Sequence, residues 1–169
     1  MTFPPPASTP LSIRAATAAD VGLILAFIRD LATYEKLLHE VEATEESLRR
    51  TMFPEDGSPV ARVLIGEWEG RPEGFAVYFH NYSTFLGKEG LYLEDVFVRP
   101  EARGRGIGKA FLLHLAQLAV EQGLGRVDWS VLDWNEPSIA FYRSLGAVPM
   151  ADWTTFRLTG LALRELGRR

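Results

Sequence analysis

Residues 91–123 constrain the fold of this chain more than any other segment. The run LYLEDVFV at Leu91–Val98 is rich in β-formers, and Pro100 ends it because proline cannot donate a ladder hydrogen bond. Glycines follow at 104, 106 and 108, and the segment Lys109–Gln122 then carries apolar residues at helical spacing before Gly123 ends it. A strand, a glycine loop and a helix in this order predict a βαβ unit.

The remaining elements complete one mixed α/β domain over residues 11–169, after a flexible proline-rich tail at residues 1–10. Thr17 and Asp20 have capping-box spacing at a helix start, and the loop Glu69–Glu73 predicts an antiparallel hairpin. We expect further strands at Leu11–Arg14, Arg62–Trp68, Gly74–His80, Arg126–Val131 and Trp153–Leu158, and further helices at Val21–Tyr34, Thr44–Thr51 and Glu136–Leu145.

Composition narrows the class of partner. The chain has 169 residues, which is enough for one domain, and its net charge of −4 disfavours nucleic acid and anionic lipid as ligands. The longest helical apolar stretch, Val21–Ile28, is far shorter than the 18 or so residues that span a bilayer. There is no cysteine, which excludes disulfides and cysteine nucleophiles and fits a cytoplasmic location. His39, His80 and His114 show no metal-ligand spacing, so no metal is expected.

The glycine loop predicts an anion site. Arg103, Arg105 and Lys109 flank its glycines at the point where a strand gives way to a helix, so unpaired N–H groups and the positive helix end face the same place. The spacing fits neither the dinucleotide fingerprint nor the Walker A loop. The structural alternative is a glycine-rich turn with incidental surface charge.

The pattern Arg103-x-x-Gly106-x-Gly108 resembles the signature by which the GNAT N-acetyltransferases hold the pyrophosphate of acetyl-CoA. The runs LYLEDVFVRPEARGRGIGK, VLDWNEPSIAFYRSLGA, IRAATAAD and LATYEK closely resemble the diamine (spermidine/spermine) N-acetyltransferases and their thialysine-acetylating relatives. The likeness covers roughly Ile13 to Leu158. It implies a single-domain GNAT fold with a mixed, mostly antiparallel twisted sheet flanked by helices, acetyl-CoA as co-substrate, a small-molecule amine acceptor and a homodimer.

Glu94 is the first catalytic candidate. The period of two in Leu91–Val98 places Tyr92, Glu94, Val96 and Val98 on one face and Leu93, Asp95 and Phe97 on the other. A carboxylate on a largely apolar face is either paired structurally or used in chemistry. The resemblance implies that Glu94 binds the acceptor amine and removes its proton, directly or through water. It also implies that backbone groups of Val96, Phe97 and Val98 pair with the pantetheine arm of coenzyme A.

Tyr142 is the second catalytic candidate. A helical tyrosine is usually core with a satisfied hydroxyl, whereas the resemblance implies that Tyr142 contacts the cofactor and protonates its departing thiolate. Asn135 is a good N-cap for the same helix, with a proline in its first turn. The cofactor contacts that the resemblance implies are Arg103, Gly104, Arg105, Gly106, Ile107, Gly108 and Lys109 in the loop, and Asn135, Glu136, Pro137 and Ser138 before Tyr142.

The resemblance places Tyr34 and Glu35, and the stretch Asp128, Trp129 and Ser130, beside the acceptor together with Glu94. Glu35 is otherwise an ordinary surface charge. The acidic stretch that the family carries before its matching tryptophan is reduced here to a single aspartate. We therefore expect a compact acceptor rather than a long polyamine.

The sequence thus predicts direct acetyl transfer from acetyl-CoA to a primary amine of a small cationic acceptor, in a ternary complex without an acyl-enzyme. Within enzymes, the alternative acceptors are an amino acid or lysine analogue, an aminoglycoside-like amine, or a protein amine. From another class, the alternative is a non-catalytic acyl-CoA sensor, which would need neither Glu94 nor Tyr142.

Overall fold

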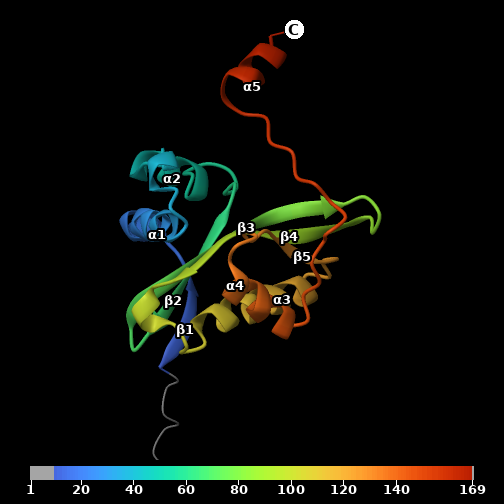
Figure 1. Cartoon of the computed structure of the whole chain (residues 1–169). Helices are drawn as coiled ribbons and strands as arrows, with labels where there is room; N and C mark the ends of the chain where they lie inside the picture. The colour runs from blue at the N-terminus through green and yellow to red at the C-terminus, as the bar shows by residue number, and fades with distance from the viewer. Residues whose placement is uncertain (1–9, 169) are drawn as a thin grey trace, which may run out of the picture. The chain divides into compact units, whose positions relative to one another are not determined.

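The computed structural model describes residues 10–168 (Figure 1), so the expected tail at residues 1–10 lies outside the described residues except for Pro10. The chain divides into a first compact unit that ends at Ser130 and a second that begins at Val131. No helix among residues 10–168 is long and apolar enough to cross a membrane.

The first unit is built on a five-stranded sheet in the order β1-β2-β3-β4-β5. The pairs β1–β2, β2–β3 and β3–β4 are antiparallel and β4–β5 is parallel, which confirms the mixed, mostly antiparallel sheet and the βαβ unit. The strands are β1 (Leu11–Ala15), β2 (Arg62–Trp68), β3 (Arg71–Ser83), β4 (Lys88–Val98) and β5 (Val127–Trp129). The helices are α1 (Val21–Tyr34), α2 (Glu45–Met52) and α3 (Ile107–Glu121), with single 3-10 turns at Ala18–Asp20, Leu38–Glu40 and Pro100–Ala102.

Helix starts follow the capping residues in the sequence. Thr17 and Asp20 form the expected capping box, and Thr44 caps α2 by accepting a hydrogen bond from the N–H of Ser47 at 3.1 Å. Asp20 also receives two hydrogen bonds from Arg14, which holds the pKa of the Asp20 carboxyl well below its usual range. These local contacts fix where α1 begins relative to β1.

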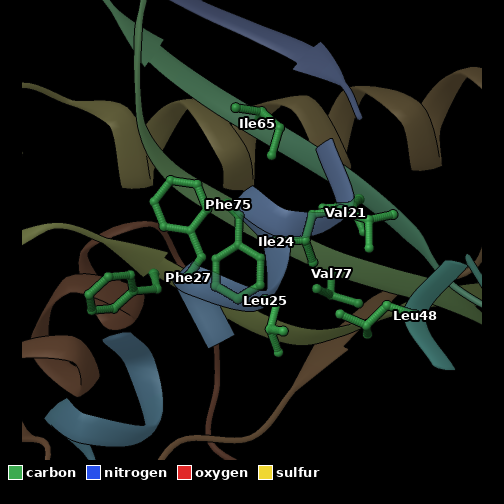
Figure 2. Packing of buried hydrophobic residues seen from close by; sticks show 10 residues of the cluster. Val21, Ile24, Leu25, Phe27, Leu48, Ile65, Phe75 and Val77 are labelled. Atoms are coloured by element: carbon green, nitrogen blue, oxygen red, sulfur yellow. The ribbon is translucent and has the colours of Figure 1, made fainter. Parts of the chain in front are cut away.

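Two layers of helix bury the two faces of the sheet. Helices α1 and α2 cover one face and α3 the other (Figure 1). On the α1 face, Figure 2 shows Phe27 and Phe75 side by side, and their rings stack 5.4 Å apart. On the α3 face, a Cβ at Gly66 would come within 2.7 Å of Ile107 and Phe111. The helix therefore packs directly on the backbone of β2 there.

The β2–β3 hairpin is tighter than expected. The turn is only Glu69 and Gly70, with φ values of 52° and 75°, so the predicted loop through Glu73 is too long. Two positive φ values are typical of the type I′ turn, whose twist matches that of the flanking strands. Strand β3 consequently begins at Arg71 rather than Gly74 and runs to Ser83.

A β-bulge in β4 corrects the predicted face assignment. Val77 pairs with Asp95 but Tyr78 pairs with Leu93, so Glu94 has no partner on β3. The extra residue reverses the alternation of side chains beyond it. Tyr92 therefore shares the α1 face with Asp95 and Phe97, and Leu93 lies on the α3 face with Val96 and Val98, because the period of two is interrupted at Glu94.

The second unit contains α4 (Glu136–Ser144) and α5 (Gly160–Leu166). The predicted strand at residues 153–158 is wrong, since this stretch has no regular secondary structure, and α5 was not expected. Trp153 and Phe156 are β-formers, but such residues form a strand only where a neighbouring strand offers hydrogen-bond partners. No described strand pairs with this stretch.

Candidate functional site

The glycine loop has the backbone geometry of an anion cradle. Gly104 and Gly106 have φ values of 77° and 83°, a conformation that glycine adopts at little cost. The first helical hydrogen bond of α3 runs from the N–H of Ala110 to the carbonyl of Gly106, so the N–H groups of residues 107–109 have no partner within the helix. Arg105 and Lys109 are exposed beside them. The loop therefore offers donors and positive charge at one point.

Two arginines of this loop are held by aromatic rings. The guanidinium carbon of Arg103 lies 4.6 Å from the ring centroid of Tyr34, and the guanidinium carbon of Arg105 lies 5.3 Å from the ring centroid of Trp68. The Nε of Arg103 also donates a hydrogen bond to the carbonyl of Val98 at 3.1 Å. Both side chains are thus oriented before any anion binds.

The outer edge of β4 is open beyond the bulge. The N–H of Arg99 donates to the carbonyl of Glu73 at 2.9 Å. In antiparallel pairing, this bond directs the backbone groups of Phe97 and Arg99 toward β3, and those of Val96 and Val98 toward the opposite edge. Strand β5 ends its pairing before this point, so no described strand covers that edge. An extended amide chain can pair there.

Three carboxylates, at the bulge and at the C-terminus of α1, are linked electrostatically. Burial raises the pKa of Glu35, the residue that caps the C-terminus of α1. Burial, followed by the charges of Glu94 and Glu35, raises the pKa of Asp95 to about 6. Glu94 itself is exposed at the bulge. The charges of the predicted Glu35 and Glu94 therefore both act on Asp95, and the three negative groups together favour a cation.

A cleft of about 500 Å³ adjoins Tyr34 and the end of β4. Its walls come from the second half of α1, from the end of β4 and from the residues that follow β4. The lining residues are Asp30, Thr33, Tyr34, Phe97, Arg99, Pro100 and Glu101. Arg99 lies 3.4 Å from Asp30, so the two charges partly neutralise each other. The cleft therefore lies between α1 and the end of β4, with one of its acidic side chains paired to Arg99.

The other predicted acceptor residues lie on β5 or directly after it, beside the paired half of β4. The carboxylate of Asp128 contacts Arg126 at 2.7 Å and accepts a hydrogen bond from Asn81 at 3.0 Å. Trp129 pairs with Leu93 in the sheet. The hydroxyl of Ser130 lies 2.9 Å from that of Tyr92, within hydrogen-bonding distance. Asp128 is thus engaged in structural contacts, unlike the carboxylates at the bulge.

The remaining predicted residues belong to the second unit. Asn135 caps α4 as expected, because its side chain accepts a hydrogen bond from the N–H of Ser138 at 3.3 Å. Glu136 and Pro137 follow in the first turn. Burial raises the pKa of Tyr142, which keeps its phenol protonated at neutral pH. Among residues 10–168, no three His, Cys, Asp or Glu side chains gather closely enough to hold a metal.

Sequence reasoning missed the importance of the bulge. The sequence predicts the two consecutive carboxylates, Glu94 and Asp95, on opposite faces of the strand. In the structure Glu94 is unpaired at the bulge, and its charge adds to burial in raising the pKa of Asp95, as does the charge of Glu35. Adjacent acids inside an otherwise apolar strand were the available signal, since a regular strand would bury one of them. The stack of Arg103 on Tyr34 had no sequence signal, because the two residues are 69 positions apart.

Comparison with known proteins is consistent with this geometry. Residues 26–147 match the model of the acetyltransferase (GNAT) family. Thialysine N-epsilon-acetyltransferase of Bos taurus is 39% identical over 165 residues, which cover 91% of this chain and 95% of that protein. L-ornithine N5-acetyltransferase of Arabidopsis thaliana is 32% identical over 199 residues, covering 92% of this chain and 87% of that protein.

Solved structures share the fold. An integron cassette protein from the mobile metagenome of V. cholerae superposes with a TM-score of 0.78 at 25% identity, over 96% of this chain and 100% of that chain. An aminoglycoside acetyltransferase from a soil metagenome superposes with a TM-score of 0.73 at 19% identity, over 89% of this chain and 96% of that chain. The second likeness concerns the fold alone.

Proposed function

Because the chain belongs to the acetyltransferase (GNAT) family, we propose that it transfers acetyl from acetyl-CoA to a primary amine of a small cationic acceptor, in a ternary complex. The observation that carries the proposal is the open half of β4. It has an anion cradle at one end, at Arg103–Lys109, and three carboxylates at the other, at the Glu94 bulge. A polyanionic cofactor and a cationic acceptor would therefore meet along one strand.

The residues present fit the cofactor. The backbone groups of Val96 and Val98 on the open edge suit an amide-bearing pantetheine arm, and the loop Arg103–Lys109 suits a pyrophosphate. The resemblance adds Asn135–Ser138 to this set. When bound, acetyl-CoA supplies an acetyl thioester that an unprotonated amine can attack.

The three carboxylates would select the acceptor. Glu35, Glu94 and Asp95 together favour a substrate that carries a second positive charge over a monoamine. The similar proteins named above act on thialysine and ornithine according to their names, and both are compact amino acids with a side-chain amine. Only Asp152 precedes Trp153 in the stretch where the family carries more acids, so a long polyamine would gain little from its distal ammonium groups.

Two proton transfers are needed, and two residues are proposed for them. An ammonium has no lone pair, so Glu94, an exposed carboxylate at the bulge, would accept the proton of the bound amine directly or through water. The departing thiolate needs a proton donor, and we assign this role to Tyr142. A phenol is protonated at neutral pH, and burial raises the pKa of Tyr142 further.

The test is an acceptor panel. We expect kcat/KM to be highest for thialysine or lysine, lower for a short diamine and spermidine, and lowest for a monoamine of matched length. Glu35→Gln should lower the ratio of kcat/KM for the diamine to kcat/KM for the monoamine. The decrease should be larger at low salt, because exposed charges are screened at high salt. Glu40→Gln, at an exposed carboxylate in the next turn, is the matched control.

Three outcomes would contradict parts of the proposal. A strong preference for spermidine would refute the argument from the short acidic stretch. Equal rates for monoamine and diamine, with a silent Glu35→Gln, would refute the acidic acceptor site. Binding of coenzyme A without turnover of any amine would favour a non-catalytic sensor. The resemblance also suggests a cytoplasmic homodimer, and light scattering on the full chain would test the dimer.

A further inference from the structure

Arg103 connects two parts of the first unit that the proposed function treats separately. Its Nε donates to the carbonyl of Val98 at 3.1 Å, which ties the side chain to the end of β4. Its guanidinium carbon lies 4.6 Å from the ring centroid of Tyr34, the last residue of α1. One cationic side chain of the glycine loop is therefore held between the end of β4 and the end of α1.

The ring of Tyr34 is well placed to transmit a change at Arg103. Phe97, whose ring centroid lies 5.9 Å from the Arg103 guanidinium, is buried in the core and cannot shift easily. Tyr34 is half-buried at the end of a helix, lines the 500 Å³ cleft and directly precedes Glu35. Fixing the ring therefore fixes the end of α1, which carries Glu35, and the charge of Glu35 acts on Asp95 at the bulge.

We propose that the stack of Arg103 on Tyr34 couples the two substrates, so that a cofactor in the glycine loop strengthens binding of the amine acceptor, and the reverse. The inference rests on the proposed function and adds a regulation of the same site. Tyr34 acts in it as a positioning residue, and Arg103 acts as the link.

The sign of the coupling follows from the geometry. Arg103 keeps its terminal N–H groups for an anion while its Nε is engaged with Val98. An anion in the loop would hold the guanidinium in its present place over Tyr34. The ordering of Arg103 and Tyr34 is then already complete when the acceptor arrives, which makes the second binding event more favourable. Reciprocity requires the same factor in both directions.

The size of the coupling is limited by the contact. A partly exposed cation–π pair is worth enough to change an equilibrium constant about threefold to tenfold. We therefore expect a coupling factor of about threefold to tenfold rather than an all-or-none dependence.

The glycine loop contains its own control. Arg105 stacks on Trp68 at 5.3 Å, so a second arginine of the same loop rests on a second aromatic ring. Trp68 ends β2, whereas the carboxylates proposed for the acceptor belong to β4 and to the C-terminus of α1. Removing this ring perturbs the loop to a similar degree without touching α1.

The experiment measures the dissociation constant of coenzyme A by calorimetry, alone and with saturating thialysine. For the wild type we expect coenzyme A to bind about threefold to tenfold more tightly with thialysine present. Tyr34→Phe keeps the ring and should keep the factor, whereas Tyr34→Leu should reduce it to about one. Arg103→Lys keeps the charge but loses the planar stack, and should also abolish it. Trp68→Leu should preserve the factor even if it weakens coenzyme A binding.

The outcomes separate the two proposals. A wild type that binds coenzyme A and acetylates amines, but whose coenzyme A affinity does not respond to thialysine, overturns the coupling alone. The coupling is also overturned if thialysine still tightens coenzyme A binding by the wild-type factor in both Tyr34→Leu and Arg103→Lys. It is overturned as well if Trp68→Leu loses this factor to the same extent as Tyr34→Leu. A wild type that binds no coenzyme A overturns the proposed function and the coupling with it.

Discussion

The two halves of β4 are parts of one strand with opposite properties. From Leu91 to Leu93, β4 has β3 on one side and β5 on the other. From Asp95 to Val98, only β3 pairs with it, and the outer edge is open among the described strands. The bulge at Glu94 separates the halves and reverses which side chains face α1. An irregularity in the ladder, rather than the ladder itself, makes this strand suitable for binding.

The proposed chemistry uses the open half of β4 together with groups outside it. Tyr142→Phe should lower kcat about 100-fold with little change in coenzyme A affinity, because the substitution would remove only the proposed proton donor. The measurement is kcat across the pH range, with coenzyme A binding as the control for folding. Wild-type turnover, with the chemical step shown to limit the rate, would mean that Tyr142 is a core residue and that the acid lies elsewhere.

Glycines near the two ends of β4 sharpen the comparison further. Gly106 and Gly87 both have positive φ, 83° and 62°, and an added Cβ meets no heavy atom within 4 Å at either position. Gly106→Val should raise the coenzyme A dissociation constant at least about tenfold, because valine strains the backbone and fills the cradle. The measurement is calorimetric titration of the folded variant.

Gly87→Val is the matched control, because it imposes the same backbone strain in the turn before the paired half. It should lower the melting temperature as Gly106→Val does and leave coenzyme A binding unchanged. Equal affinities for the two variants would show that the loop is only a turn with surface charge.

The sequence predicts well what is decided locally. The capping box at Thr17, the N-cap at Asn135 and the glycine loop before α3 all involve residues a few positions apart, and the structure has each of them. The bulge at Glu94 depends on the register of β3, which is not written in β4 itself. The strand predicted at Trp153–Leu158 failed for the same reason, since its residue types specify no partner.

The same distinction applies to the site. The candidates in the loop and at Glu94 rest on local patterns or on the resemblance. That Asp128 is engaged by Arg126 and Asn81 depends on side chains that meet across strands. The contact of Arg103 with Tyr34 joins α1 to the loop after β4 and is equally non-local. The sequence alone can thus indicate which residues lie near a site, but not which side chains contact one another there.

The third prediction concerns the free energy of unfolding that the buried carboxyl group of Asp95, in the open half of β4, costs the protein. Its pKa is raised to about 6, whereas an unfolded chain gives about 3.9, so the folded state binds the extra proton between these values. Its contribution to stability is therefore complete below pH 4 and is lost as the pH rises through 6. Asp95→Asn should be more stable than the wild type by about 1 kcal/mol at pH 8 and by clearly less at pH 5.

Urea unfolding at the two pH values measures this difference, and Glu40→Gln, at an exposed carboxylate, supplies the control. The acceptor KM of Asp95→Asn at pH 8 should rise, since a negative charge is lost beside Glu35. A stability difference that does not depend on pH would show that Asp95 titrates normally. The carboxylates of the bulge would then not lower the free energy of unfolding at high pH.

The smallest effect is expected in the paired half. The hydroxyls of Tyr92 and Ser130 lie 2.9 Å apart at an exposed position, and the ring of Tyr92 also packs against Phe79 at 5.3 Å. Tyr92→Phe keeps the ring and removes one exposed hydrogen bond, which should cost about 0.5 kcal/mol in the free energy of unfolding. Tyr82→Phe, at a 60% exposed tyrosine of β3, calibrates the loss of a hydroxyl as such.

If the paired half of β4 is only structural, kcat/KM of Tyr92→Phe for the best acceptor should differ from that of the wild type by less than about twofold. A tenfold fall in kcat/KM with unchanged stability would instead mean that Tyr92 orients Ser130 toward the acceptor. The boundary between structure and function would then lie on β5 rather than at the Glu94 bulge.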